Sequence, residues 1–444
     1  MTGHLEFYDL MTASKSIMFM PFPLKFAVLY SRFIYQRCAL ILMLGTLAIS
    51  SGCDDDDAIQ PAISTLNVGV MIPLSGNAAS TGESVSAALT IAHADLDGYL
   101  ESIGSDLDIK LRFIDTGADP STSQDVLEEL HDEGIQYVIG PYSSADVAAT
   151  LDFANANDIL ILSPASVASS LAIENDNCYR LVPSDKNQAV AVKALFVHDD
   201  IQTIIPIVRN DVWGEGLISD VNDELTTEGI TLRNTIFYDP SNMDVEAISQ
   251  KVSDEIDAAA MQTPLDKIGV YLLSFGEGTE VLQAASQFEA NASVNWYGSS
   301  AYANNNSLIN DSEARAFATE QKLLCPSFAP DPSVEDLWGP IESELIALLG
   351  RTPETYALTS YDALWVITMS YLLSEQPEDI DQFKTSLEEV TMYYNGITGR
   401  TTLDTYGDRK FASFNFWGID QDGSTFDWKS YGFYNNATGQ LVIE

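Results

Sequence analysis

Residues 137–166 read YVIGPYSSADVAATLDFANANDILILSPAS and hold a strand, a helix and a second strand in succession. The apolar runs Tyr137–Ile139 and Ile159–Leu162 have strand length, and Ala145–Ala154 between them has helical spacing. A loop of small and hydroxyl residues follows each apolar run. Apolar strands that alternate with helices predict a parallel sheet covered by helices on both faces.

The same alternation extends in both directions from this stretch. Before it, the sequence predicts strands at Leu66–Ile72 and Ile109–Ile114 and helices at Ser84–Leu96 and Ser123–Asp132. After Asn175–Pro183 the pattern starts again. The strands predicted there are Thr203–Val208, Thr231–Tyr238, Ile268–Leu273 and Val294–Tyr297, and the helices are Asn187–Val197, Gly216–Thr227, Val245–Ala260 and Glu277–Ala290. Two successive α/β units of similar size predict a bilobed protein with a cleft between the lobes.

The last part of the chain has a different pattern. Val334–Val390 is mainly helical in spacing, and strands are predicted at Ile397–Leu403, Lys410–Gly418 and Trp428–Tyr434. The turns Tyr406-Gly407-Asp408 and Asp422-Gly423 join these strands. Because no low-complexity linker separates the two units, we expect several chain crossings between the lobes.

The N-terminal segment predicts export and lipid attachment. The apolar run Cys38–Ser50 is too short to span a bilayer, which needs about 20 residues, but it suits a secretory signal. Residues 1–52 are therefore predicted to be a signal peptide whose start is over-extended. Ser-Ser-Gly precedes Cys53, and this resembles a bacterial or archaeal lipoprotein signal that is cut before the acylated cysteine. A signal anchor with a cysteine at its edge is the alternative, and residues 53–63 would form an acidic tether.

The composition excludes several classes of function. The chain has 65 Asp and Glu residues against 21 Lys and Arg, a net charge of −44, which argues against binding to nucleic acid or to anionic lipid. The sequence lacks the Gly-x-Ser-x-Gly, His-Glu-x-x-His and Walker patterns. We therefore predict no enzyme activity, no cofactor and no metal site.

Several short motifs, in this order and spacing, resemble the type I periplasmic binding proteins of the leucine/isoleucine/valine-binding class. They are Val68–Gly76, Val138–Gly140, Ile161–Ala165, Tyr179–Asp185, Trp213–Gly216, Asn395–Gly399 and Leu403–Arg409. The resemblance implies two Rossmann-like lobes that are joined by three crossovers and close around a small ligand. It implies a first lobe at about 64–180 plus 327–396 and a second at 181–326 plus 397–444.

The serine loops are the first predicted wall of the ligand site. In parallel α/β sheets, ligands lie beyond the carboxyl ends of the strands, where helix N-termini point at them. Ser143, Ser144 and Ser166 can cap helices there, while free N–H groups hold a carboxylate or another acceptor-rich group. The alternative is that these serines are N-caps only. The resemblance places ligand-contacting groups in these loops, including Ala165, and Ser75 after the first strand is a weaker third wall.

The second lobe is where the sequence departs from the family. Trp213 stands where amino-acid binders often carry tyrosine, and a family tyrosine falls near Phe275. Ser300 occupies the place of the acid that meets the ligand ammonium, and a buried ammonium without a carboxylate is costly. Glu277, Asp211 and Asp115 are candidates for the missing charge.

We therefore predict a monomeric, extracytoplasmic solute-binding lipoprotein. It would capture a small polar ligand (amino-acid-like, amide or carboxylate) for the permease of an ABC importer and be tethered to the membrane through Cys53. The alternative is a regulatory or sensor module of the same fold that acts on a cell-envelope protein. Because export places the chain in an oxidising compartment, Cys178 and Cys325 are candidates for a disulfide, with isolated buried thiols as the alternative.

Overall fold

The computed structural model describes residues 64–444, so the predicted signal peptide, Cys53 and the acidic tether lie outside the described residues. The described chain forms two compact units. Of the described residues, the smaller unit contains 64–66 together with Ala94–Ile109, and the larger contains Asn67–His93 and Lys110–Glu444. Among the described helices, none combines the length and apolar character that crossing a membrane requires.

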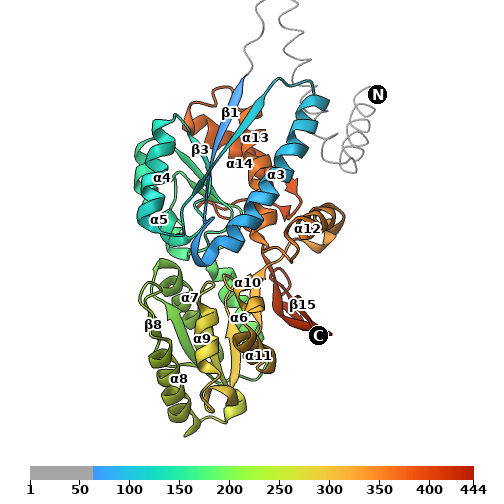
Figure 1. Ribbon diagram of the computed structural model, residues 1–444. Coiled ribbons are helices and arrows are strands. Elements are labelled where there is room, and N and C mark those ends of the chain that lie inside the picture. The colour runs from blue at the N-terminus through green and yellow to red at the C-terminus, as the bar shows by residue number, and fades with distance from the viewer. Residues whose placement is uncertain (1–63) are drawn as a thin grey trace, which may run out of the picture. The chain divides into compact units, whose positions relative to one another are not determined.

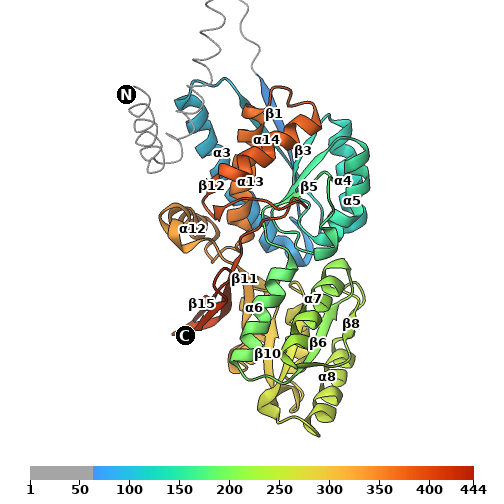
Figure 2. The same cartoon turned by 180° about the vertical axis from the view of Figure 1, so that it is seen from behind.

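The first lobe is built on a five-stranded sheet in the order β2-β1-β3-β4-β5. Its strands are β1 (Thr65–Ile72), β2 (Asp108–Asp115), β3 (Tyr137–Ile139), β4 (Leu160–Ser163) and β5 (Cys178–Arg180). The associated helices are α3 (Ala79–Ser102), α4 (Pro120–Asp132), α5 (Ser144–Ala156), α13 (Tyr356–Leu373) and α14 (Ile380–Tyr393). The pairs β1–β3, β3–β4 and β4–β5 are parallel. Figures 1 and 2 show α4 and α5 on one face of this sheet and α13 and α14 on the other.

The second lobe repeats this design with the order β10-β9-β6-β7, and β8 also pairs with β6. Its strands are β6 (Thr203–Arg209), β7 (Thr231–Leu232), β8 (Ile236–Tyr238), β9 (Ile268–Leu273) and β10 (Asn295–Gly298). The helices are α6 (Asp185–His198), α7 (Val212–Glu228), α8 (Val245–Ala260), α9 (Gly278–Ala285), α10 (Asn306–Asn310) and α11 (Ser312–Glu320). One buried cluster contains the apolar side chains of α6 and α7, and a second contains those of α8, α9 and α11. These clusters cover the two faces of the sheet.

An antiparallel sheet completes the fold. Its order is β11-β14-β15-β16, and its strands are β11 (Cys325–Phe328), β14 (Ser413–Asp422), β15 (Thr425–Asn435) and β16 (Gln440–Ile443). α12 (Glu335–Leu349) follows β11, and the short pair β12 (Asn395–Gly396) and β13 (Gly399–Arg400) precedes β14. The chain thus passes between the lobes after β5, after β11 and after β13.

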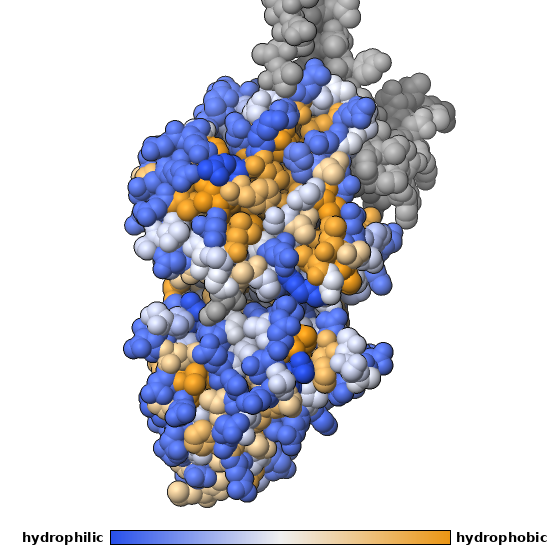
Figure 3. Space-filling view, viewed as in Figure 1, coloured by the Kyte–Doolittle hydropathy of each residue, from blue (hydrophilic) through white to orange (hydrophobic). Residues whose placement is uncertain are grey.

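Hydrophilic side chains cover most of the second lobe on the face shown in Figure 3, while apolar side chains gather on the visible face of the first lobe. This hydrophilic surface agrees with the large excess of Asp and Glu over Lys and Arg in the chain. Charged groups remain hydrated at such a surface and contribute little to folding.

Most strands of the two parallel sheets lie where the apolar runs predict them, but two strand predictions are wrong. Thr231–Tyr238 is not one strand, because β7 and β8 are separated by a break and pair with different parts of β6. Ile397–Leu403 is not a strand, because the chain turns back between β12 and β13. β16 was not predicted, and α9 ends at Ala285, five residues earlier than expected.

The predicted disulfide is also wrong. Cys178 and Cys325 are both free and buried. Cys178 lies in the cluster formed by the apolar residues of β3, β4, α4 and α5, whereas Cys325 lies in the cluster of α8, α9 and α11. Each thiol is therefore enclosed by its own apolar neighbours, as free cysteines usually are.

Candidate ligand-binding site

The loop after β3 places two serines at the start of α5. Ser143 is the N-cap of this helix, and its hydroxyl oxygen accepts a hydrogen bond from the Asp146 N–H at 3.1 Å. Ser144 is the first residue of the helix and is almost fully buried. An extended N-cap backbone with a short hydroxyl side chain favours helix initiation at this point. The loop thus has its predicted position at the carboxyl edge of the first sheet.

A network of hydroxyl groups joins this loop to the loop after β4. The Ser144 and Ser166 hydroxyl oxygens are 3.0 Å apart, and the N–H groups of Val167 and Ala168 donate to Ser144 Oγ at 3.2 and 3.1 Å. Ser163 Oγ donates to the Pro141 carbonyl at 2.8 Å and accepts from the Ser166 N–H at 3.0 Å. These hydroxyls therefore hold the two loops in a fixed relation. Their contact with a ligand stays a prediction.

Aromatic side chains form the corresponding part of the second lobe. Trp213, in the first turn of α7, is 2% exposed, and its ring centroid lies 5.1 Å from that of Phe275 in the loop after β9. The Arg209 guanidinium lies 4.4 Å from the Phe275 ring centroid. Trp213 and Phe275 belong to the same buried cluster as Ala165 and Val167 of the first lobe. The structure thus brings the predicted positions Ala165, Trp213 and Phe275 into one cluster.

The three acids proposed as counter-charges for an ammonium already make other contacts. Glu277 Oε1 accepts hydrogen bonds from Arg209 Nη1 at 2.7 Å and from the Tyr238 hydroxyl at 2.9 Å, while its buried Oε2 has no partner. Asp211 caps α7 through the Gly214 N–H and pairs with Arg209.

Asp115 holds the loop after β1 instead. Its Oδ1 accepts from the N–H groups of Leu74 and Gly117 at 2.7 and 2.8 Å, and from that of Ser75 at 3.2 Å. Ser75 is exposed, unlike the buried serines of the network described above.

Asp185 is the functional candidate that the sequence reasoning missed. It begins α6, is 1% exposed, and its Oδ2 atom has no hydrogen-bond partner. Burial raises the pKa of this carboxyl group well above its usual value, and the neighbouring Asp220 adds to the rise, while Arg180 and a hydrogen bond to Trp213 oppose it. The motif Tyr179–Asp185 contained this residue, but nothing in a sequence motif reveals an unpaired buried oxygen.

A small cavity of about 10 Å³ lies next to Asp185, with room for about one water molecule. Its lining comes from both lobes: Val167, Pro183, Asp185, Gln188, Ser300, Phe328, Tyr356 and Phe414. Gln188 connects two of these groups, because its Nε2 lies 3.4 Å from Asp185 Oδ1 and its Oε1 accepts from the Ser300 N–H at 3.1 Å. Gln188 thus links Ser300 to the Asp185 carboxyl group, so an acid lies near the position where the sequence has serine in place of the family's acid.

The comparisons with known proteins agree with this geometry. Residues 85–422 match the family model described as the receptor family ligand binding region, and this match covers more than half of the chain. The chain belongs to this family, that of the type I periplasmic binding proteins.

Relatives of this periplasmic binding protein match it over most of its length. An uncharacterised protein of Methanocaldococcus jannaschii is 28% identical over 396 residues, which cover 85% of this chain and 91% of the relative. A Leu/Ile/Val-binding protein of Rhizobium johnstonii is 21% identical, with 79% and 91% covered. The solute-binding protein of an ABC transporter from R. palustris, solved with 4-hydroxybenzoate, superposes with a TM-score of 0.70 at 13% identity, with 84% and 97% covered. The similarity to the R. palustris protein concerns the fold alone.

Proposed function

We propose that this chain is an extracytoplasmic solute-binding protein that captures a small amino-acid-like ligand between its lobes. The observation that carries the proposal is the meeting of the serine loops, the Trp213–Phe275 pair and the unpaired Asp185 carboxyl group at the carboxyl edges of two parallel sheets. This edge is where open α/β sheets bind their ligands.

The two sides of the site favour different groups of a ligand. The helix N-terminus and hydroxyls at Ser143, Ser144 and Ser166 favour a carboxylate. Asp185 favours a cationic group, since an ammonium would supply the donor that its Oδ2 atom lacks. The rings of Trp213 and Phe275 would cover an apolar part of the ligand. An amino acid or a similar zwitterion has these three features.

The names of the relatives support a carboxylate-bearing ligand. The Rhizobium relative is a Leu/Ile/Val-binding protein, and the R. palustris neighbour is solved with 4-hydroxybenzoate. Both kinds of ligand carry a carboxylate beside an apolar group. We extend this shared chemistry to the present chain and infer that a permease of an ABC importer is its partner.

Native mass spectrometry of the freshly purified protein tests the proposal, because a retained small molecule would be weighed directly. After the retained molecule has been removed, calorimetric titration with it compares the affinity of the wild type with the affinities of Asp185→Asn and Trp213→Phe. We expect both variants to bind at least about tenfold more weakly, which corresponds to about 1.4 kcal/mol.

Asp244→Ala is the matched control, since it alters an acidic N-cap on α8 and touches none of the cleft residues named above. Its affinity should equal that of the wild type. Unchanged affinity in both cleft variants would contradict the site, and hydrolysis or other turnover of the bound molecule would contradict the function.

A further inference from the structure

The guanidinium group of Arg409 lies where the three crossings between the lobes meet. Arg409 belongs to the third crossing, between β13 and β14, and is 3% exposed. Its Nη1 donates to the carbonyl of Leu181, which begins the first crossing, at 3.2 Å. Its Cζ lies 4.7 Å from the ring centroid of Phe328, the residue that ends β11 before the second crossing. One buried side chain therefore contacts all three crossings.

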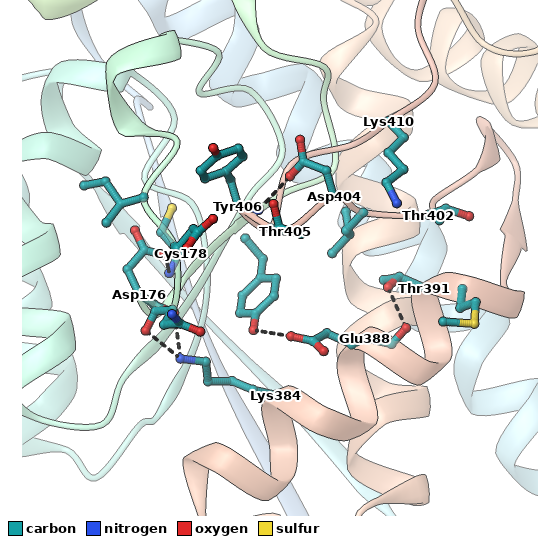
Figure 4. Close-up of a pocket in the computed structure, with 17 residues that line it drawn as sticks. Asp176, Cys178, Lys384, Glu388, Thr391, Thr402, Asp404, Thr405, Tyr406 and Lys410 are labelled. Carbon is teal, nitrogen blue, oxygen red and sulfur yellow. Dashed lines mark hydrogen bonds between the residues drawn. The ribbon is translucent and has the colours of Figure 1, made fainter.

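The backbones of the first and third crossings also run together. The Arg180 N–H donates to the Gly407 carbonyl at 2.9 Å, and the Arg409 N–H donates to the Arg180 carbonyl at 3.1 Å. Figure 4 shows the preceding residues of both stretches, with Cys178 near Tyr406. Backbone hydrogen bonds thus fix the base of the Arg409 side chain, from which the guanidinium reaches the other segments.

The charge of Arg409 is linked to a buried carboxylate through a hydroxyl group. Arg409 Nη1 donates to Thr398 Oγ1 at 2.7 Å, and its Nη2 donates to the Thr398 carbonyl at 2.9 Å. The Thr398 hydroxyl in turn donates to Asp362 Oδ2, and the Thr398 N–H donates to the same oxygen at 3.0 Å. Asp362 lies on α13 of the first lobe and is fully buried. A carboxylate, a hydroxyl and a guanidinium therefore form one buried chain from α13 to the crossings.

This chain of contacts resists movement of the hinge. Burial lowers the pKa of Arg409 to about 10, against the opposing carboxylates of Asp362 and Asp331, so the guanidinium is charged at neutral pH. Hydrogen bonds to a buried charge are costly to break. Hinge segments absorb a rotation of lobes through changes in their backbone dihedral angles. Where one guanidinium holds three such segments, these changes must also lengthen its contacts.

We propose that Arg409 is a positioning residue of the hinge, which together with Thr398 and Asp362 ties the three crossings to one another and restricts the opening of the lobes. This role goes beyond the proposed function and does not depend on which ligand the cleft binds. A side chain outside the cleft thereby sets the range of lobe arrangements that a ligand meets.

The distance between spin labels on the two lobes tests the proposal. Glu128→Cys on α4 and Glu215→Cys on α7 place the labels on exposed positions, in a full chain that also lacks Cys38 and Cys53. The two remaining cysteines are buried. Pulsed electron resonance then gives the distribution of interlobe distances in protein from which any retained molecule has been removed.

Thr398→Val is the decisive variant, because it removes the hydroxyl between Arg409 and Asp362 and keeps the shape of the side chain. We expect the distance distribution to broaden and to shift to longer distances. Arg409→Lys should have the same effect, since one ammonium group cannot replace the two guanidinium nitrogens that contact Leu181 and Thr398. This second variant decides the question if Thr398→Val does not fold.

Two further variants separate the hinge from a general loss of stability. Thr398→Ser keeps the hydroxyl group, so it should restore the wild-type distribution. Thr391→Val is the matched control, because Thr391 is equally buried but donates only to the Glu388 carbonyl of its own helix, at 3.2 Å (Figure 4). It should leave the distribution unchanged.

The proposal is overturned if folded Thr398→Val or Arg409→Lys keeps the wild-type distribution, if Thr391→Val broadens it as much, or if Thr398→Ser does not restore it. Since no ligand enters this measurement, its outcome is separate from the outcome of the binding experiments on the cleft.

Discussion

At the scale of single residues, Asp185 is a buried acid of the candidate cleft whose environment is costly for a charge. Its carboxyl group is buried, and one oxygen lacks a partner. Burial raises the pKa of Asp185, so in the absence of ligand the folded protein holds this proton more tightly than the unfolded chain does. The contribution of this group to stability is therefore present at low pH and is lost as the pH rises from the usual aspartate range through the raised pKa.

The corresponding prediction concerns Asp185→Asn. In the ligand-free state this variant should be more stable than the wild type at neutral pH, because it removes the cost of ionising a buried acid. The difference between the two proteins should shrink as the pH is lowered. Thermal melts of both proteins from pH 4 to pH 8 measure this difference. A variant that is less stable than the wild type at pH 7 would show that the Asp185 carboxylate is satisfied within the protein.

At the scale of elements, we expect the N-cap of α5 to affect both the stability of the protein and its affinity for the ligand. Ser143→Ala removes the side-chain hydrogen bond to the Asp146 N–H, and it should lower the free energy of unfolding by roughly 0.5–2 kcal/mol. Asp244→Ala removes a comparable cap from α8, at 3.0 Å from the Ala247 N–H, and should cost a similar amount. Urea denaturation measures both changes.

Ligand affinity then separates the two caps. Only Ser143→Ala should weaken binding of the co-purified molecule, because only this cap adjoins the serine network of the first lobe. Equal affinities in both variants would mean that Ser143 is an N-cap and nothing more.

The parallel sheets were largely predictable from the sequence because their strands are buried on both faces and read as continuous apolar runs. β3, β4 and β9 are buried throughout. The antiparallel sheet was harder, since β15 mixes exposed, partly buried and buried positions, β16 has no buried position, and both are specified by their partners across the ladder.

The same reasoning applies to the candidate site. The loops at Ser143–Ser144 and Ser163–Ser166 could be found because strand and helix signals flank them. The surroundings of Asp185 include Trp213 and Ser300, which come from other parts of the chain, so local spacing could not reveal its unpaired oxygen.

At the scale of the whole molecule, a buried ion pair secures the chain where it crosses between the lobes. Arg180 on β5 makes a bidentate contact with Asp408, and its Nη1 donates to the Ala168 carbonyl at 2.7 Å. The guanidinium thus joins the crossing segment to the loop that follows the serine network. Arg180 is 1% exposed, so its charge depends on Asp408 for compensation.

Asp408→Asn should therefore lower the free energy of unfolding by about 3 kcal/mol, since removal of one partner leaves a buried charge uncompensated. Denaturant unfolding measures this loss. Asp404→Asn, on the same segment but without a contact to Arg180, is the control and should cost much less. A loss equal to that of the control would mean that water already compensates Arg180.

The membrane tether is a further prediction at this scale. Cys53→Ser should abolish incorporation of a fatty-acid analogue and leave the protein unprocessed or released. Metabolic labelling of the wild type and the variant tests this. A signal that persists without Cys53 would contradict lipid attachment at this residue.

The two free thiols among residues 64–444 have a practical consequence for finding the ligand. Burial raises the pKa of both Cys178 and Cys325, so in the folded protein neither is available as a reactive thiolate. In a variant that also lacks Cys38 and Cys53, a maleimide dye would therefore couple selectively to a new cysteine such as Glu215→Cys, which is exposed on α7 two residues from Trp213. Because closure of the lobes would change the surroundings of the dye, its fluorescence would turn the protein into an optical sensor. Such a sensor can screen a whole library of metabolites and let the protein itself select the solute.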